Sequence, residues 1–130
     1  MTLLRLAALP VIAIACLGTA PGETPAPETR CGILSNPTPA NWWLDDRDGN
    51  WTIGVQGGYQ AEGLETMPEN LFEAGWVRTN GYYGYRCACL KVTTDRAAMR
   101  VIEVFSGKPR PMAACDGDKA LQEALAKAIP

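Results

Sequence analysis

Histidine is absent from this 130-residue sequence. Without an imidazole the chain cannot form a Ser-His-Asp or Cys-His catalytic constellation, and it offers no histidine ligand to a metal ion. An excess of positive charge is also missing, because 12 lysines and arginines stand against 14 aspartates and glutamates, a formal net charge of −2. Nucleic-acid-binding proteins normally present a basic face, so this composition argues against a nucleic-acid partner.

Long hydrophobic runs are missing too. The longest apolar stretch, Leu6 to Ala15, is about half of the roughly 20 residues that a transmembrane helix needs, and it follows a single charge at Arg5. Small residues at Ala13 and Ala15 form an A-x-A cleavage pattern. The sequence therefore predicts that residues 1–20 are a signal peptide or a lipoprotein leader.

Two fates of this leader remain open. The first is ordinary secretion, with cleavage after Ala15. The second is lipid anchoring, because Ala13-Ile14-Ala15-Cys16 also resembles a bacterial lipobox, in which the cysteine is acylated. Cys16 is thus a candidate lipidation site, and membrane contact is expected only through such an anchor. The expected location is the periplasm or, for a lipoprotein, the outer membrane.

Four further cysteines predict two disulfides: Cys31, Cys87, Cys89 and Cys115. Cys87 and Cys89 lie two apart on an expected strand, and a bond between them would strain disulfide geometry. Two pairings remain, 31–87 with 89–115 or 31–89 with 87–115, and each bridge is expected to stabilise the fold by about 2–4 kcal/mol. A C-x-C unit suits neither structural zinc nor a redox-active pair, so we expect no metal and no cofactor.

The expected domain division is a leader (1–20), a flexible linker (21–30) rich in Pro, Thr and Glu, and one β-rich domain (31–130). Asp48-Gly49 predicts a β-hairpin between residues 41–46 and 51–56, with Leu44 opposite Ile53. Asn80-Gly81 predicts a second hairpin that pairs Trp76 with Tyr85, whose long second strand turns across residues 95–98 and returns as residues 99–105.

Near the C-terminus the spacing of apolar residues changes from the alternation typical of strands to the four-residue spacing typical of a helix. Leu121, Leu125 and Ile129 recur every four residues after Asp116 and Asp118, either of which can cap a helix. Residues 60–74 are expected to form a loop with at most one helical turn. The predicted fold class is mainly β (α+β): a small antiparallel sheet or meander of hairpins, with two disulfides and a short C-terminal amphipathic helix.

Candidate functional side chains are of two kinds. Paired carboxylates can perform acid–base catalysis on glycans, and the candidates are Asp45, Asp46, Glu62 and Glu65. Aromatic residues beside arginine are typical of recognition surfaces. Trp42 and Trp51 are expected in the core, whereas the expected binding surface comprises Trp43, Tyr82, Tyr83 and Arg78.

The sequence also resembles a known family. The matching segments are an Arg30-Cys-Gly opening, Asn36-Pro-Thr-Pro-Ala-Asn-Trp-Trp, Gln56-Gly-Gly-Tyr-Gln-Ala-Glu-Gly and the run from Arg78 to Leu90 that contains G-Y-R-C-A-C. Together they resemble a family of small exported bacterial proteins of unknown function over residues 30–115. The resemblance implies a bacterial envelope protein and no particular activity.

The sequence thus favours a non-enzymatic binding or stabilising protein of the bacterial envelope, with an envelope protein or a glycan as its partner. A specific version is an inhibitor of a cell-wall-cleaving enzyme. The alternative is a carboxylate-dependent enzyme that acts on envelope glycans.

Overall fold

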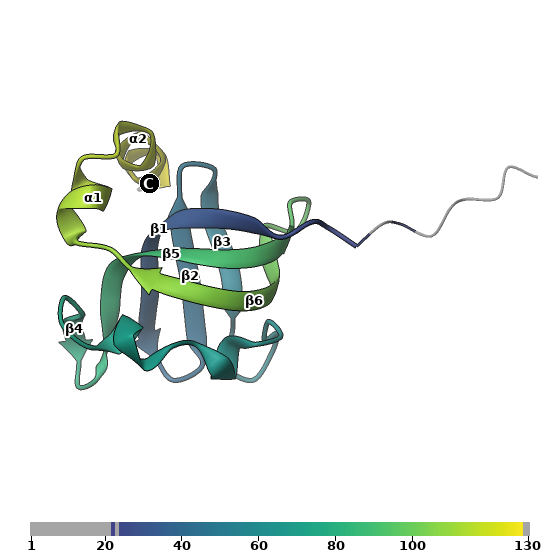
Figure 1. The fold of residues 1–130 in the computed structure, drawn as a ribbon, viewed down its shortest axis with the longest axis horizontal. Helices are drawn as coiled ribbons and strands as arrows, with labels where there is room; N and C mark the ends of the chain where they lie inside the picture. Colours follow the sequence, from purple (N-terminus) through teal and green to yellow (C-terminus); the bar gives the residue numbers. More distant parts are fainter. Residues whose placement is uncertain (1–21, 23, 129–130) are drawn as a thin grey trace, which may run out of the picture.

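The computed structural model describes residues 22 and 24–128 and shows a mainly β protein with one mixed sheet (Figure 1). The predicted fold class is confirmed. The expected leader (1–20), the candidate lipidation site Cys16 and the helix residue Ile129 lie outside the described residues. The strands are β1 (Glu28–Thr38), β2 (Asn41–Asp46), β3 (Gly49–Gly54), β4 (Val77–Asn80), β5 (Tyr83–Asp95) and β6 (Arg100–Pro109). The helices are the 3-10 turns η1 (Leu64–Thr66) and η2 (Glu69–Phe72), then α1 (Met112–Asp116) and α2 (Lys119–Ala128).

Five of the six strands close into a ring. β1 pairs with both β2 and β5, and β6 pairs with both β5 and β3, so the order β1-β2-β3-β6-β5 returns to β1. β3 and β6 meet at one parallel pair, Thr52 with Arg100, and the segment around Gln60 and Glu62 bridges the rest of that seam. The sheet is therefore mixed and closed, where the sequence suggested an antiparallel meander. β4 pairs only with β5 and stands outside the ring.

The interior of the ring is filled by apolar side chains, as in other small barrels. Burial alternates along the strands because successive side chains point to opposite faces. Fully buried side chains contribute roughly 1.5–3 kcal/mol each relative to exposure, so this cluster is the main source of stability. Its largest members are Leu34, Leu44, Trp51, Ile53, Leu71, Leu90, Val92 and Val101.

The first predicted hairpin exists, but its expected register is wrong. Leu44 pairs with Trp51 instead of Ile53, because the two turn residues are Arg47 and Asp48. Asp46 fixes this turn by accepting the Asp48 N–H at 2.8 Å. The shift of two residues keeps the same side chains on the inner face, so the predicted apolar face survives.

The second predicted hairpin also exists with a different register. Val77, rather than Trp76, lies opposite Tyr85, and the turn falls on Gly81 and Tyr82. A slip of one residue exchanges the two faces of a strand. Trp76 therefore lies just before β4 and joins a cluster of aromatic rings, described below.

β1 begins at Glu28, inside the segment 21–30 that was expected to be a flexible linker. Pairing with β5 accounts for this early start, because Glu28 lies opposite Val92 and its carboxylate accepts a hydrogen bond from the Thr94 hydroxyl at 2.6 Å. Residues 24–27 before it are exposed.

The C-terminal helix is present as predicted. Asp118 caps it, since its carboxylate accepts the Leu121 N–H at 3.2 Å, and this bond lowers the pKa of Asp118. Leu121 is buried with Cys87 and Cys115 in a second apolar cluster outside the ring. The short helix α1 before it was not predicted from the sequence.

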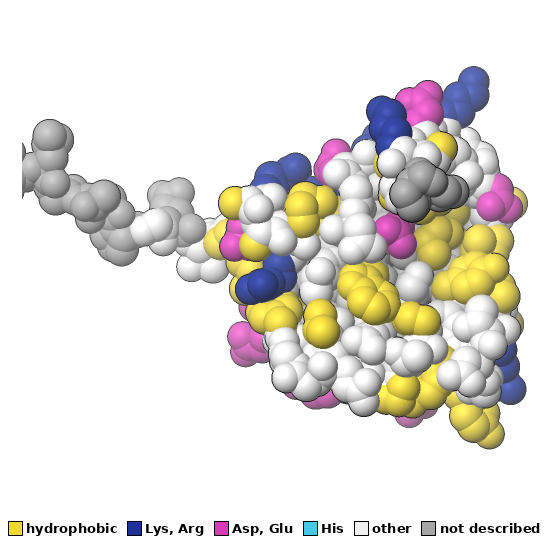
Figure 2. All heavy atoms as spheres, turned by 180° about the vertical axis from the view of Figure 1, so that it is seen from behind, with side chains coloured by type: hydrophobic (Ala, Val, Ile, Leu, Met, Phe, Trp, Pro, Cys, Tyr) yellow, Lys and Arg dark blue, Asp and Glu magenta, His cyan; other side chains and the backbone are white. Residues whose placement is uncertain are grey.

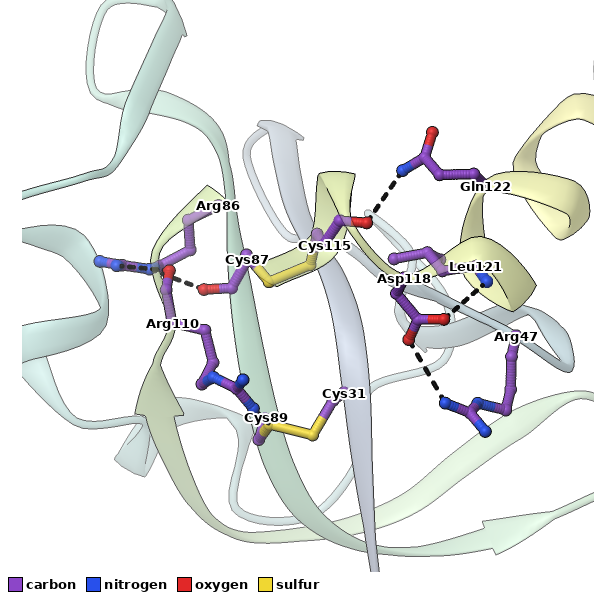
Figure 3. Close-up of a disulfide and its surroundings, with 10 residues drawn as sticks. All are labelled: Cys31, Arg47, Arg86, Cys87, Cys89, Arg110, Cys115, Asp118, Leu121 and Gln122. Carbon is purple, nitrogen blue, oxygen red and sulfur yellow. Dashed lines mark hydrogen bonds and ion pairs between the residues drawn. A yellow bond between two sulfur atoms is a disulfide. The ribbon is translucent and has the colours of Figure 1, made fainter. Parts of the chain in front are cut away.

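Both disulfides form, in one of the two pairings left open: Cys31–Cys89 and Cys87–Cys115 (Figure 3). Cys31 and Cys89 are directly opposite each other on β1 and β5. Cys87 faces outward from β5 and holds α1 against the ring. Disulfides persist in oxidising compartments, so this pair suggests an exported environment.

Two glycines allow the close contacts that position the segments around β4. A Cβ at Gly84 would lie 1.9 Å from the carbonyl oxygen of Val77, so only glycine permits this β4–β5 approach. A Cβ at Gly107 would lie 2.8 Å from a methyl carbon of Leu71, and its absence lets η2 settle on β6.

We predict that the Cys87→Ala/Cys115→Ala double variant loses about 3–4 kcal/mol of unfolding free energy, because a loop of 28 residues is no longer closed in the unfolded chain. Urea denaturation measures the loss, and hydrogen exchange should show faster exchange in α1. The Cys31→Ala/Cys89→Ala variant is the control and should leave α1 protected. Wild-type unfolding free energy in the first variant would contradict this prediction.

Candidate functional site

One end of the barrel is closed by a cluster of charges around Arg30, an inward-facing residue that is only 6% exposed. Its Nη1 donates to Asp46 Oδ2 at 2.6 Å and to Asp48 Oδ2 at 2.9 Å, and its Nε donates to Glu28 Oε1 at 2.9 Å. The guanidinium also lies 3.9 Å from the ring centroid of Trp51. Each of the charged side chains named here is paired with one of opposite sign.

Electrostatics in the Arg30 cluster favour the charged forms. Burial alone would lower the pKa of Arg30, but hydrogen bonds to Asp48, Asp46 and Glu28 outweigh it and raise that pKa. The Thr94 hydroxyl and then Arg30 lower the pKa of Glu28, and the Arg30 hydrogen bond lowers the pKa of Asp48. A hollow of about 330 Å³ lies here, but its charged groups already satisfy one another.

The opposite end of β1 borders a surface of a different kind. Six residues line a hollow of about 330 Å³: Asn36, Trp42, Phe72, Trp76, Tyr82 and Tyr83. Trp42 and Phe72 also line a second hollow of about 500 Å³, together with Gln60, Leu64, Glu65 and Met67. We call these two adjoining hollows the aromatic groove. Figure 2 shows hydrophobic side chains gathered in patches over the back of the molecule, including the side away from the N-terminal segment.

The walls of the aromatic groove are held by contacts between rings. Phe72 packs edge-on against Trp42 at 5.7 Å and against Trp76 at 5.3 Å between ring centroids. The Trp76 Nε1–H donates to the Tyr82 carbonyl at 3.0 Å, which ties the hairpin turn to the segment before β4. Tyr82 itself is 82% exposed, with Arg78 at 5.1 Å over its ring.

Arg86 lies behind the aromatic groove and holds the backbone of the segment that carries Phe72. It faces inward from β5, is 3% exposed, and donates only to backbone carbonyls: Cys87, Leu71 and Ala74 at 3.1 Å and Arg110 at 3.3 Å. Burial lowers the pKa of Arg86. By bonding Leu71 and Ala74, it fixes η2 and the following turn, the segment that carries Phe72 and leads to Trp76 (its bond to Arg110 is in view in Figure 3).

The predicted binding residues are partly brought together. Tyr82 and Tyr83 line the aromatic groove and Arg78 covers the Tyr82 ring, but Trp43 lines neither hollow. Trp43 precedes the inward Leu44, so strand alternation points it to the outer face of β2. Trp51 is fully buried as expected, whereas Trp42, also expected in the core, is half-buried and borders both hollows.

Four lining residues were not predicted as binding residues from the sequence: Asn36, Trp42, Phe72 and Trp76. The spacing of Phe72 and Trp76, four apart beside a hairpin, was a signal that could have found two of them. Asn36 gave no such signal, because it faces the groove only after β1 pairs with β5.

The four candidate carboxylates lie in different parts of the fold. Asp46 is buried and bonded to Arg30 and to the Trp51 Nε1–H at 2.9 Å, and Asp45 accepts from Asn50 at 2.8 Å. Glu65 lines the aromatic groove, and Glu62 bridges to β6 through its backbone. No described hollow is lined by two of these carboxylates. Across residues 24–128 no cluster of three metal-ligating side chains occurs.

A family model matches residues 25–122, a range that holds both disulfides, the Arg30 cluster and the aromatic groove. The chain belongs to the DUF4087 family. This family is described as a protein of unknown function, so membership in DUF4087 agrees with the expected family of unknown function and assigns no activity. Comparisons with curated proteins and with solved structures gave no match. None of the helices in the described part of the chain is long and apolar enough to cross a membrane.

We predict that the DUF4087 domain loses stability as the pH falls below about 4. Glu28 and Asp48 have lowered pKa values in the folded protein. The unfolded chain, with carboxyl pKa values of about 3.9–4.3, therefore takes up protons first, and stability is lost as pH falls toward the folded pKa values. Unfolding free energies measured between pH 7 and pH 3 should decline most steeply in that acidic range.

The Asp48→Asn variant should show a shallower decline than wild type, because one of the protonating groups is gone. Asp45→Asn is the matched control, since Asp45 bonds Asn50 outside the Arg30 cluster. Parallel curves for wild type and Asp48→Asn would show that this cluster does not set the acid sensitivity.

Proposed function

We propose that this protein is a non-enzymatic binding module of the bacterial envelope, periplasmic or tethered to the outer membrane through Cys16, and that the aromatic groove is its binding surface. The observation that carries the proposal is the groove itself. It combines large aromatic rings with a supporting scaffold in which Arg86 fixes the loop behind them.

The composition of the groove supports recognition. Trp and Tyr bury large areas at a low cost in side-chain entropy, and they keep a polar tip for hydrogen bonding. The volumes of the two hollows fall in the range of roughly 300–1,000 Å³ that is usual for small-ligand sites. Because Phe72 packs on both Trp42 and Trp76, these three rings need little ordering when a ligand arrives.

The two disulfides support the proposed location outside the cytoplasm. Covalent links between β1 and β5 and between β5 and α1 suit a protein that works where thiols are oxidised. The leader read from residues 1–20 and the lipobox at Cys16 point to the same place. We do not propose the alternative function, a carboxylate-dependent enzyme, because the candidate carboxylates occupy separate places in the fold.

The test is retention of envelope components by the immobilised protein. Purified insoluble cell-wall sacculi and detergent-solubilised envelope proteins are offered separately to wild type and to a Phe72→Ala/Tyr82→Ala variant. These side chains are 36% and 82% exposed, so their truncation should spare the core. The proposal expects at least one component to be retained by wild type and lost, by about tenfold or more, in the variant.

Phe105→Ala is the matched control, because Phe105 is an exposed aromatic residue, 47% accessible, that lines neither hollow. It should retain the same component as wild type. Retention of nothing, or equal retention by wild type and by the groove variant, would sink the proposal.

A further inference from the structure

Asn36 borders the first hollow of the aromatic groove and is 7% exposed. Its Nδ2 donates to two backbone carbonyls, Thr38 at 2.9 Å and Asn41 at 2.8 Å. Because both neighbours are acceptors, the amide can take only this orientation, and its oxygen must point away from them. The turn between β1 and β2 thereby fixes the direction of the Asn36 Oδ1.

The Asn36 oxygen accepts no hydrogen bond from residues 24–128. No side-chain oxygen or nitrogen in this part of the chain is both sealed from solvent and without a partner, so Asn36 Oδ1 keeps some contact with solvent. The hollow that Asn36 borders is the aromatic one. A nearly buried side chain that lines this hollow therefore has one acceptor with no partner among the described residues.

Gln60, an exposed residue that lines the second hollow, has the same bonding pattern. Its Nε2 donates to Ala40 O at 3.1 Å and to Val55 O at 2.9 Å, which leaves Oε1 without a donor among the described residues. Each hollow is thus lined by one amide residue whose nitrogen is bonded to a pair of backbone carbonyls, and Gln60 Oε1 lies beside Gly54. Trp42 and Phe72 stand between the two.

We propose that the aromatic groove binds a neutral, linear glycan of N-acetylated amino sugars. This inference rests on the proposed function and names its ligand. A sugar ring presents C–H groups that pack on aromatic faces, and an acetamido group adds a methyl for the rings and an N–H for an acceptor. Asn36 Oδ1 receives one acetamido N–H, and Gln60 Oε1 receives another one along the chain.

Charge and size fit a glycan of this kind. The groove has Arg78 over Tyr82 at one end and Glu65 in the other hollow, so it carries no excess of either sign for an anionic or cationic ligand. Two hollows of about 330 and 500 Å³ in series accommodate more than one sugar unit. A proline-rich peptide fits less well, because proline lacks the N–H that the two amide oxygens require.

The experiment compares two trisaccharides with the same β-1,4 linkage: chitotriose, which carries acetamido groups, and cellotriose, which carries hydroxyls in their place. Each is titrated to millimolar concentrations into the isotope-labelled protein while amide, Asn and Gln side-chain and tryptophan Nε1–H signals are followed. We expect chitotriose to shift the Trp42, Trp76 and Asn36 signals, and cellotriose to bind about tenfold more weakly.

Tyr82→Ala should weaken chitotriose binding, whereas Phe105→Ala should leave it unchanged. Equal binding of the two sugars would overturn the assignment to acetamido groups. If neither sugar binds but a solubilised envelope protein or a peptide of residues 21–30 shifts the same signals, the glycan is the wrong ligand while the groove remains the binding surface. If sugars, sacculi, peptide and envelope proteins all leave the groove signals unmoved, the proposed function fails with the inference.

Discussion

The structure around the aromatic groove depends on one buried cation, the guanidinium of Arg86. Among the described residues it has no carboxylate partner and donates instead to four backbone carbonyls, which belong to β5, η2, the turn after η2 and the residue after β6. Hydrogen bonds to a charged group contribute about 1.5–3 kcal/mol each, and the desolvation of the cation offsets part of that gain. Removing the guanidinium would take a donor from the Leu71 and Ala74 carbonyls, whereas the Cys87 carbonyl would keep the Arg110 N–H at 2.8 Å, so η2 and the turn after it would loosen from β5.

Each end of the barrel buries an arginine, and the two arginines have different hydrogen-bond partners. Arg30 and Arg86 each precede a disulfide cysteine, and strand alternation places the arginine inside the ring and the cysteine outside it. Arg30 is paired with carboxylates, which protonate in acid, whereas Arg86 is paired with carbonyls, which do not. At the end of the barrel that carries the groove, the buried arginine is therefore held by hydrogen bonds to groups that do not protonate in acid.

The closed ring and the disulfides act on the same strands. The β1–β5 pairing runs from Glu28 to Asn36 and includes the linked pair Cys31 and Cys89. That pairing carries Arg30 to one end and Asn36 to the other, and it places Asn36 opposite Gly84, next to the tyrosines of the second hairpin. The covalent link thus holds the register that brings an amide oxygen and the aromatic rings to one surface.

Local signals in the sequence predicted much of the fold. Asp48-Gly49 and Asn80-Gly81 located both hairpins, the four-residue spacing of Leu121 and Leu125 located α2, and the C-x-C spacing limited the disulfide pairings to two. The register of each hairpin was missed, because Asp46 and the turn at Tyr82 decide it through contacts that no dipeptide shows. Closure of the ring and the inward arginines depend on long-range pairing, so the groove that joins Asn36, Phe72 and Tyr82 could not be assembled from the sequence.

The most direct test of the central role of Arg86 is amide hydrogen exchange in an Arg86→Met variant, with Arg110→Met as the control that keeps the Arg110 carbonyl. We predict exchange about tenfold faster or more at Leu71 and Trp76, with β1 and β5 protected as in wild type and the control unchanged. Unchanged protection of Leu71 and Trp76 in a folded Arg86→Met protein would contradict it.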